Sequence, residues 1–193
     1  MPWIKFLKNN GFDVFAVVPS GAWNKHIEAG GATLVKWELS RSGRNPIQEI
    51  GSILGLARIL RQIKPDIVHN FHTKPNIYAP IASKLAGIRL TVSTVTGLGY
   101  TFVDRPGLAS KLTQRMNMGL YSISNRIANE ITFQNPDDMV LLRTQNALPR
   151  KKGRMIAGGS GIDVTEYHPN MRNSTTSLKL RQCLGIPEGA YVA

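Results

Sequence analysis

Polar side chains follow two short apolar segments near the middle of the chain. Residues 66–69 and 90–95 are rich in β-branched side chains, and the first segment is followed by Asn70, His72 and Lys74. An imidazole can donate or accept a proton near neutral pH, and an ammonium group can hold a phosphate as a point charge. These residue types suit a site that orients a hydroxyl group or holds a phosphorylated ligand.

The second segment is followed by a glycine-containing loop with Thr96, Gly97, Gly99 and Tyr100. Glycine permits close approach of the backbone, so the amides of this loop can face an anion or a sugar. The spacing is not that of a dinucleotide fingerprint, because the third glycine would fall at Phe102. The Walker lysine is also missing, and both observations argue against a dehydrogenase or a phosphate-loop NTPase.

The sequence offers few of the residues that a metal site or a cysteine-based site would need. His69 and His72 are three residues apart with no third ligating residue beside them, so we expect no metal site. We interpret His69 as a hydrogen-bonded imidazole of the core, whereas for His72 a structural and a functional role both stay open. Cys183 is the single cysteine, which excludes an intrachain disulfide.

The two apolar segments belong to one supersecondary unit. Residues 77–86 between them have helical spacing, which predicts a βαβ unit with parallel strands. In open parallel sheets, ligands bind beyond the carboxyl ends of the strands. We therefore expect both polar loops at one ligand-binding edge.

The rest of the chain predicts a Rossmann-like parallel sheet flanked by helices. A chain that opens on a helix is unusual for such a fold, so we expect an upstream strand to be missing. Residues 1–169 are expected to form one domain, and residues 170–193 a linker and the start of a second domain that was cut off. Further strands are expected at residues 12–18, 33–39, 130–133 and 154–157, and helices at 3–9, 23–29, 46–64, 106–128, 136–144 and 178–184.

The chain is strongly basic. Its 193 residues carry 24 Lys and Arg against 12 Asp and Glu, a formal charge of +12, which favours polyanionic partners. The cations are not interleaved with aromatic residues and no nucleic-acid module is recognisable, so nucleic acid is not expected as a partner. The densest cationic run, residues 143–154, is interpreted as a solvated loop.

Six short runs together resemble one family. In order and spacing they are similar to the N-terminal half of the family 4 retaining glycosyltransferases of GT-B fold. The closest likeness is to members that act on polyprenyl-diphosphate-linked glycans in bacterial surface polysaccharide or glycoprotein assembly. The matching runs are residues 10–14, 65–70, 73–78, 95–100, 133–135 and 159–163.

The resemblance implies two Rossmann-like domains that face a cleft, with the acceptor bound by this half and the nucleotide sugar mainly by the other. It implies a nucleotide-sugar donor, UDP-linked, as substrate, with no further cofactor and no metal. Many relatives carry a histidine where this chain has Thr96 and Gly97. The site residues expected from residue types and resemblance together are His72 and Thr96 as catalytic residues, Asn70, Lys74, Gly97, Gly99, Tyr100 and Arg105 for the acceptor, and Gln134, Asn135, Ser160 and Gly161 on the nucleotide-sugar side.

The expected activity is transfer of a hexose or N-acetylhexosamine, with retention, to a lipid-linked or polysaccharide acceptor. The expected location is the cytoplasmic face of the plasma membrane, with Arg105, Lys111 and Arg115 toward anionic lipid. The 193-residue chain alone is expected to be inactive, because half of the cleft would be missing.

Two other classes of function remain open. A sugar-nucleotide epimerase has a similar two-domain shape, but it needs carboxylates and histidines for proton abstraction, and the loops offer few acids. The other alternative is a basic α/β domain without enzymatic activity that binds anionic lipid or nucleic acid.

Overall fold

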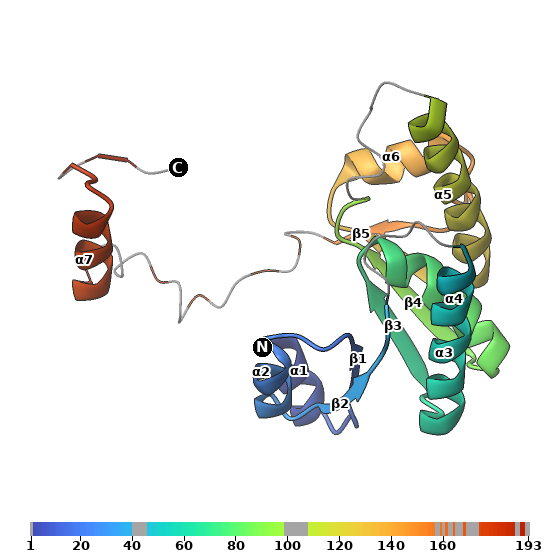
Figure 1. Cartoon of the computed structure of the whole chain (residues 1–193), viewed down its shortest axis with the longest axis horizontal. Coiled ribbons are helices and arrows are strands. Elements are labelled where there is room, and N and C mark those ends of the chain that lie inside the picture. The colour runs from blue at the N-terminus through green and yellow to red at the C-terminus, as the bar shows by residue number, and fades with distance from the viewer. Residues whose placement is uncertain are drawn as a thin grey trace. The chain divides into compact units, whose positions relative to one another are not determined.

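The computed structural model describes residues 2–39, 46–98, 108–156, 159, 161, 164, 168, 174–187, 190 and 191. The chain divides into two compact units, Met1–Ser160 and Gly161–Ala193, and Figure 1 shows the elements of both. The second unit holds one described helix, α7 (Thr175–Cys183), which the Ser174 hydroxyl caps by accepting a hydrogen bond from the Ser177 amide. The expected domain boundary at residue 169 stays a prediction.

The first unit contains two parallel sheets. One has the order β3-β4-β5-β6, and the other consists of β1 and β2. Every strand pair is parallel, so the predicted βαβ unit and the α/β fold class are confirmed. The strands are β1 (Phe15–Val18), β2 (Thr33–Lys36), β3 (Ile67–Phe71), β4 (Leu90–Val95), β5 (Glu130–Phe133) and β6 (Arg154–Met155).

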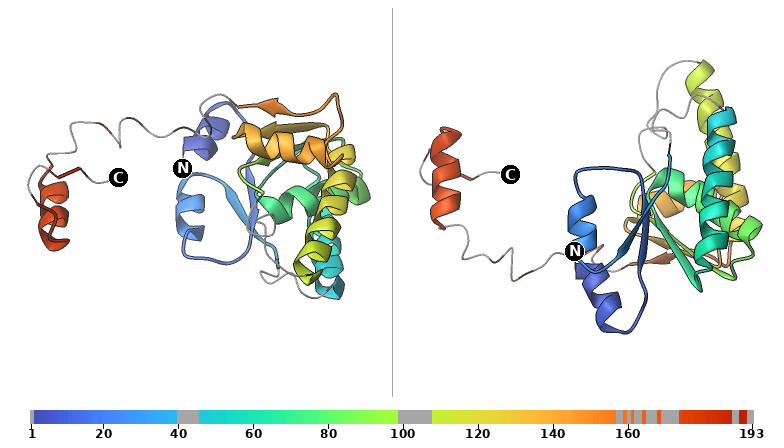
Figure 2. Two further views of the ribbon diagram at one scale, coloured as in Figure 1. Left: turned by 90° about the horizontal axis from the view of Figure 1, so that it is seen from above. Right: turned by 60° about the horizontal axis from the view of Figure 1, so that its bottom comes forward.

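A helical layer covers one face of the larger sheet. The helix α4 packs against α3 on one side, against α5 on the other, and against β3 and β4 beneath it, as the views in Figure 2 also show. The largest side chains that are completely buried in this core include Tyr121, Phe133, Ile131 and Leu142. The helices of the first unit are α1 (Pro2–Asn9), α2 (Asn24–Ala29), α3 (Pro46–Ile63), α4 (Thr73–Ala86), α5 (Leu108–Ile127) and α6 (Pro136–Thr144).

The start of α4 differs from the expectation. The sequence predicts a helix at residues 77–86, but α4 begins four residues earlier, and Asn70 and Phe71 extend the strand before it. Pro75 is tolerated in the first turn because the amides there have no intrahelical partner. The supposed loop is therefore a tight strand-to-helix junction with a single residue, His72, between the two elements.

The smaller sheet is tied to the helical layer by Trp37. This indole is buried just after β2, and its Nε1 donates a hydrogen bond of 3.0 Å to the Ser52 carbonyl on α3. Val17 of β1 packs against the same core. The two sheets thus share one hydrophobic core although no ladder joins them.

Lys152 corrects the interpretation of residues 143–154 as a solvated loop. Its Nζ donates to the carbonyls of Asn125 (3.1 Å), Arg126 (2.9 Å) and Ala128 at the end of α5. Desolvation lowers the pKa of this ammonium group, while the nearby Glu130 carboxylate opposes the effect. Carbonyls at a helix carboxyl end lack backbone partners, and a cation is favourable there.

We expect Lys152→Ala to lower the free energy of unfolding by about 1–2 kcal/mol, because three helix-end carbonyls lose a charged donor. Urea unfolding followed by circular dichroism measures the change. Lys151→Ala is the matched control, since this neighbouring lysine is exposed. Equal unfolding midpoints for the two variants would show that Lys152 does not stabilise the end of α5.

Candidate functional site

His72 links β3 to α4 in a conformation that side chains other than glycine rarely adopt. Its backbone has φ 69° and ψ 164°, and holding such a residue costs about 1–3 kcal/mol. Its Nδ1 lies 3.2 Å from the Thr96 hydroxyl at the end of β4. The two residues predicted as catalytic thus meet at the carboxyl edge of the sheet, and the exposed imidazole is oriented by a hydrogen bond.

A buried amide network lies beneath this pair. The Asn70 Nδ2 donates to Asn76 Oδ1 (2.9 Å) and to Ser93 Oγ (2.8 Å), and Asn76 Nδ2 donates to the Thr94 carbonyl (2.9 Å). These bonds join β3, α4 and β4. Both donors of Asn70 are used internally, and its Oδ1, which has no hydrogen-bond partner among the described residues, is buried.

Thr73 joins the first turn of α4 to the glycine-containing loop. Its hydroxyl lies 3.0 Å from the Leu98 carbonyl and 3.4 Å from the Gly97 carbonyl. It also interacts with the hydroxyl of Tyr121, whose pKa is raised chiefly by burial. Sequence reasoning missed Thr73, although a threonine between His72 and Lys74 was a visible signal.

Lys74 is paired within the chain. Its Nζ lies 3.0 Å from Glu49 Oε1 and 3.2 Å from Oε2, and the Tyr78 hydroxyl donates to Glu49 Oε2. Burial, together with this bond and the carboxylate charge, raises the pKa of Tyr78. Because Glu49 already offsets the charge of Lys74, any phosphate would have to compete with this carboxylate for the ammonium group. Glu49 lies in the first turn of α3, and nothing in the sequence pattern connected it with Lys74.

The end of β5 contributes backbone and capping contacts. The Gln134 amide donates to the Val95 carbonyl (3.1 Å), which places Gln134 at the same sheet edge as Thr96. Asn135 caps α6, with its Oδ1 accepting from the Asp138 amide (2.8 Å) and its Nδ2 donating to the Asp138 carboxylate (2.7 Å). The Asn135 side chain therefore has a structural role in this chain.

The remaining predicted residues are distributed as follows. A Cβ atom at Gly97 would meet no atom of the described residues within 4 Å. Gly161 belongs to the second unit. Gly99, Tyr100, Arg105 and Ser160 lie outside the described residues.

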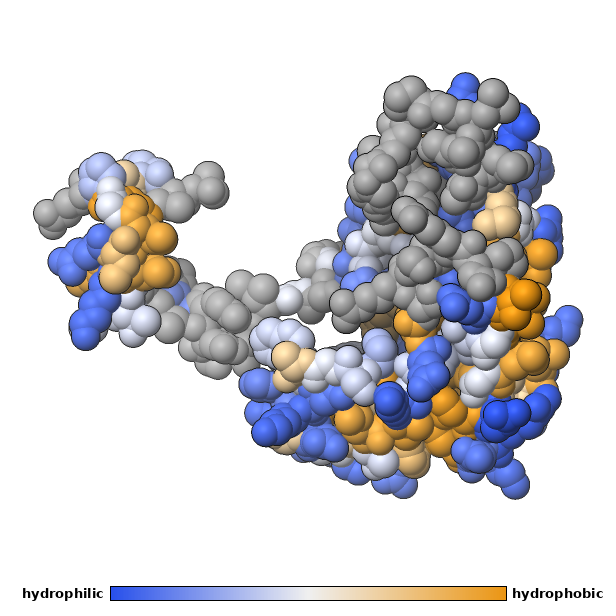
Figure 3. Space-filling model, in the orientation of Figure 1, coloured by the Kyte–Doolittle hydropathy of each residue, from blue (hydrophilic) through white to orange (hydrophobic). Residues whose placement is uncertain are grey.

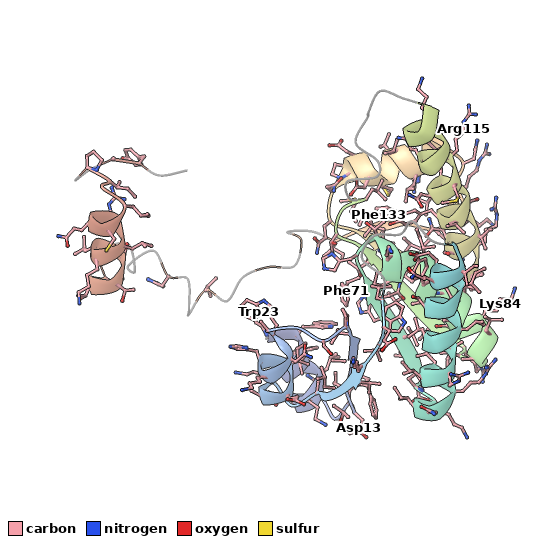
Figure 4. The ribbon with its side chains drawn as sticks, in the orientation of Figure 1. Asp13, Trp23, Phe71, Lys84, Arg115 and Phe133 are labelled. Atoms are coloured by element: carbon pink, nitrogen blue, oxygen red, sulfur yellow. The ribbon has the colours of Figure 1, made fainter. Side chains whose placement is uncertain are left out.

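His69 is only partly what the sequence suggested. Its Nε2 lies 2.7 Å from the Thr94 hydroxyl, so the predicted hydrogen bond is confirmed, and partial burial lowers the pKa of the imidazole. The placement in the core is wrong, because His69 lies on an exposed face of β3 beside Phe71, a residue labelled in Figure 4. The reason is that Asn70 faces α4, and since successive side chains of a strand point to opposite faces, His69 points away from the helical layer.

Two features of the described residues bear on what the chain can bind. No group of three or more His, Cys, Asp and Glu that could hold a metal is found in the described part. Two cavities of about 490 Å³ each lie instead at the opposite end of β4, around Arg89. They are remote from the His72–Thr96 pair, so the candidate site is the carboxyl edge of the sheet and not either of these cavities.

A parallel sheet with a helical layer and polar residues beyond its strand ends defines a Rossmann-like ligand-binding domain. Residues 1–135 match the family model described as "Glycosyl transferase 4-like". This match covers more than half of the chain, so the chain belongs to that family, and the resemblance to family 4 glycosyltransferases is confirmed.

Two curated relatives have related names. One is an N,N'-diacetylbacillosaminyl-diphospho-undecaprenol alpha-1,3-N-acetylgalactosaminyltransferase of Campylobacter jejuni, 26% identical over 88% of this chain and 44% of its own. The other is a UDP-Gal:alpha-D-GlcNAc-diphosphoundecaprenol alpha-1,3-galactosyltransferase of Escherichia coli, 24% identical over 76% of this chain and 35% of its own. The chain thus spans less than half the length of these relatives.

Two solved structures show the fold. A glycosyltransferase from Rickettsia africae aligns with a TM-score of 0.65 and 16% identity, covering 97% of this chain and 45% of that one. The MurG protein of Acinetobacter baumannii aligns with a TM-score of 0.53 and 16% identity, covering 84% and 41%. The chain therefore has the fold of one half of a GT-B glycosyltransferase.

The backbone conformation of His72 leads to a prediction about stability. At this position we expect glycine to be more stabilising than alanine, which is the reverse of the usual order. Both His72→Gly and His72→Ala remove the imidazole and its contact with Thr96, but only glycine relieves the strain. We expect the glycine variant to be more stable than the alanine variant by about 1 kcal/mol or more, although glycine ordinarily costs about 0.5–1 kcal/mol relative to alanine within a helix or strand.

Thermal and urea unfolding of the two variants measure this difference. The same pair of substitutions at Glu28, an exposed position within α2, gives the ordinary order of stability for comparison. If His72→Ala is the more stable variant, the backbone of His72 stores no strain.

Proposed function

We propose that this chain is the acceptor-binding half of a retaining glycosyltransferase that extends a polyprenyl-diphosphate-linked glycan. The carrying observation is that His72 and Thr96 meet at the ligand-binding edge of a chain of this family. The names of both curated relatives describe acceptors linked to undecaprenyl diphosphate. Both names support a hexose or N-acetylhexosamine as the transferred sugar, and the name of the Escherichia coli relative supports a UDP-linked donor.

In this proposal the two side chains orient the acceptor hydroxyl. The hydroxyl oxygen bonds to the anomeric carbon of the donor sugar, the bond from that carbon to the diphosphate breaks, and the electron pair leaves with the diphosphate. The hydroxyl proton passes to an oxygen of the departing diphosphate during this step. Positioning and stabilisation of the developing charge then account for most of the rate acceleration. The amide network around Asn70 acts indirectly, because it holds the ends of β3 and β4 in register.

In the proposal this half binds the acceptor and the other half binds the nucleotide sugar, and the contacts of Lys74 agree with that. A cation that is already paired with Glu49 is a poor sole anchor for the diphosphate of a nucleotide sugar. We assign the donor diphosphate to the other half of the cleft. On this basis the chain alone binds acceptor but transfers no sugar.

We expect the 193-residue chain to bind a polyprenyl-diphosphate N-acetylhexosamine in nanodiscs, and His72→Ala or Thr96→Val to weaken that binding about fivefold, the effect of losing one hydrogen bond. Titration against a fluorescent form of this lipid measures the affinity. A radiolabelled UDP-sugar assay with the same samples is expected to show no transfer.

Thr33→Val is the matched control, because Thr33 is an exposed threonine on β2, away from the proposed site. Equal affinity for all variants would argue against acceptor binding at this edge. Sugar transfer by the isolated chain would contradict the division between the two halves.

We further propose that the protein binds peripherally to the cytoplasmic face of the plasma membrane. Lys111 and Arg115 are exposed on α5, and Arg115 projects outward from it in Figure 4. Met116 on the same helix and Ile50 on α3 are exposed apolar side chains. Figure 3 shows apolar residues among hydrophilic ones on the face in view, a combination that suits a headgroup layer with acyl chains beneath it. Within the described residues, no helix is long and apolar enough to cross a membrane.

Charge reversal at both positions, Lys111→Glu with Arg115→Glu, is expected to reduce binding to vesicles with anionic lipid by about tenfold or more, since each cation near such a surface contributes about 1 kcal/mol. Flotation of the full chain with anionic and with neutral vesicles measures this. The control carries Lys5→Glu and Lys25→Glu, the same change of charge at two exposed lysines of α1 and α2. A loss of equal size in the control, or binding that does not depend on anionic lipid, would contradict the proposed membrane face.

A further inference from the structure

Two adjoining cavities lie at the amino edge of the larger sheet, at the opposite end of β4 from the candidate site. Each has a volume of about 490 Å³, and both are lined by residues 87–89, the turn that leads from α4 into β4. The first cavity also reaches the end of α3, and the second reaches the end of α5. A ligand that lies across residues 87–89 can therefore occupy both cavities at once.

The side chains that line these cavities are strongly basic. Five of them are cations, and one, Asp66, is a carboxylate. All five cations are exposed, and none forms a salt bridge with a carboxylate of the described residues. Charges of one sign around a concave surface attract ions of the opposite sign and raise their local concentration. We call these five residues the amino-edge cations: Arg61, Lys64, Lys84, Arg89 and Arg126.

The helix ends explain part of this charge. The helices α3, α4 and α5 end beside the cavities, and their last turns hold Arg61, Lys84 and Arg126. A cation in that position is favourable because it offsets the negative end of the helix dipole. Arg89 lies outside the helices, and Lys64 adds a second cation to the end of α3. Helix stability alone therefore does not explain why five cations gather here.

Other donors already bond to carbonyls at these helix ends. Lys152 donates to three carbonyls at the end of α5. At the end of α4, the backbone amide that follows the helix donates to one carbonyl (3.2 Å), and Arg61 Nη2 donates to another (2.7 Å). Among the described residues, the side chains of Lys64, Lys84 and Arg89 have no hydrogen-bond partner. Their donors are therefore available to an anion.

The backbone of Lys64 is a second indication of a binding role. Lys64 has φ 51°, which lies in the left-handed region where glycine is the usual residue after a helix. The residue that follows α4 is indeed a glycine, Gly87, with φ 79°. A lysine is less favourable than glycine in this conformation, and residues held in such conformations cluster at ligand-binding sites.

We propose that the amino-edge cations bind a soluble compound with two or more linked phosphate groups, which lies across residues 87–89 and places phosphates in both cavities. Ammonium and guanidinium groups form strong hydrogen bonds with phosphate oxygens, and a guanidinium can hold two oxygens at once. Arg89 lines both cavities, so we assign its guanidinium to the phosphates on either side of the link.

The lining of the cavities favours phosphate groups over a nucleobase or a membrane. Among the described residues, no aromatic side chain lines either cavity, so neither offers a surface on which a base could stack. The larger apolar residues of the lining, Pro65, Ile88 and Ile127, are only partly exposed. They therefore offer little apolar surface to the acyl chains of a lipid layer.

Calorimetric titration of the 193-residue chain with tripolyphosphate and with orthophosphate tests the proposal. We expect tripolyphosphate to bind at least about tenfold more tightly, because linked phosphates can occupy both cavities in one binding event. In NMR spectra of the same chain, tripolyphosphate is expected to shift the amides of residues 87–89 and to leave those of residues 96–98 unchanged. This second readout separates the amino edge from the candidate site.

The double variant Lys64→Ala with Lys84→Ala is expected to weaken tripolyphosphate binding about tenfold or more, since two charged donors are lost. The matched control is Lys5→Ala with Lys25→Ala, the same change of charge at two exposed lysines of α1 and α2. Arg89→Gln is expected to remove most of the preference for tripolyphosphate over orthophosphate, because Arg89 contacts both cavities.

Lys64→Gly separates binding from folding. This substitution removes the cation but suits the positive φ of the backbone. We therefore expect it to weaken tripolyphosphate binding about threefold or more, while the midpoint of thermal unfolding stays the same or rises. A variant that loses affinity without losing stability shows that the ammonium group acts on the ligand and not on the fold.

Several results would overturn the proposal. One is equal affinity for tripolyphosphate and orthophosphate, and another is equal affinity of the double variant and its control. Shifts confined to residues 96–98 would assign the phosphates to the candidate site. Vesicles with anionic lipid, or a short RNA, are titrated at the same phosphate concentration. Tighter binding to either of them than to tripolyphosphate, lost in the double variant, would identify a membrane or a nucleic acid as the ligand instead.

Discussion

The buried hydrogen bonds of Asn70 and Asn76 hold the candidate site together. They connect β3, α4 and β4 at the point where the backbone leaves the strands. An unsatisfied amide in such a place costs about 1–3 kcal/mol, so these bonds favour one relative position of the three elements. That constraint keeps His72 in its strained conformation and brings its imidazole to Thr96. The contacts of Thr73 with the Gly97–Leu98 backbone add a second connection between the same two strand ends.

Some of the chain's cations are paired with other groups of the chain, and this affects how its positive charge is interpreted. The chain has a formal charge of +12, yet Lys74 beside the candidate site is paired with Glu49, and Lys152 is occupied by helix-end carbonyls. The surplus of positive charge is therefore carried largely by exposed side chains, such as those on α5. A role at an anionic surface follows more directly from these exposed cations than from the cations nearest the site.

The two sheets share a core without sharing a ladder. Trp37 and Val17 attach the β1–β2 layer to the helices, while the edges of β1 and β3 stay unpaired among the described residues. Hydrophobic contact and the Trp37 hydrogen bond attach this layer to the helices, whereas a continuous parallel sheet adds backbone hydrogen bonds along its whole length. His69 and Phe71 are exposed because they lie on the face of β3 opposite to α4.

Local patterns were sufficient to predict the elements and the edge where the site lies. The β-branched runs, the helical spacing between them and the prolines and glycines at their ends predict a parallel βαβ unit, and they place His72 and Thr96 after neighbouring strands. Only the tertiary structure decided what these residues do to one another. Glu49 and Lys74 are 25 residues apart, and their pairing depends on how α3 packs on α4. Asn70 is buried and His69 exposed because of which face of β3 the helices cover. The early start of α4, which makes His72 a strained junction, is likewise set by contacts with β4 and α5. Local preference extends over a few residues, whereas these outcomes depend on packing between elements distant in sequence.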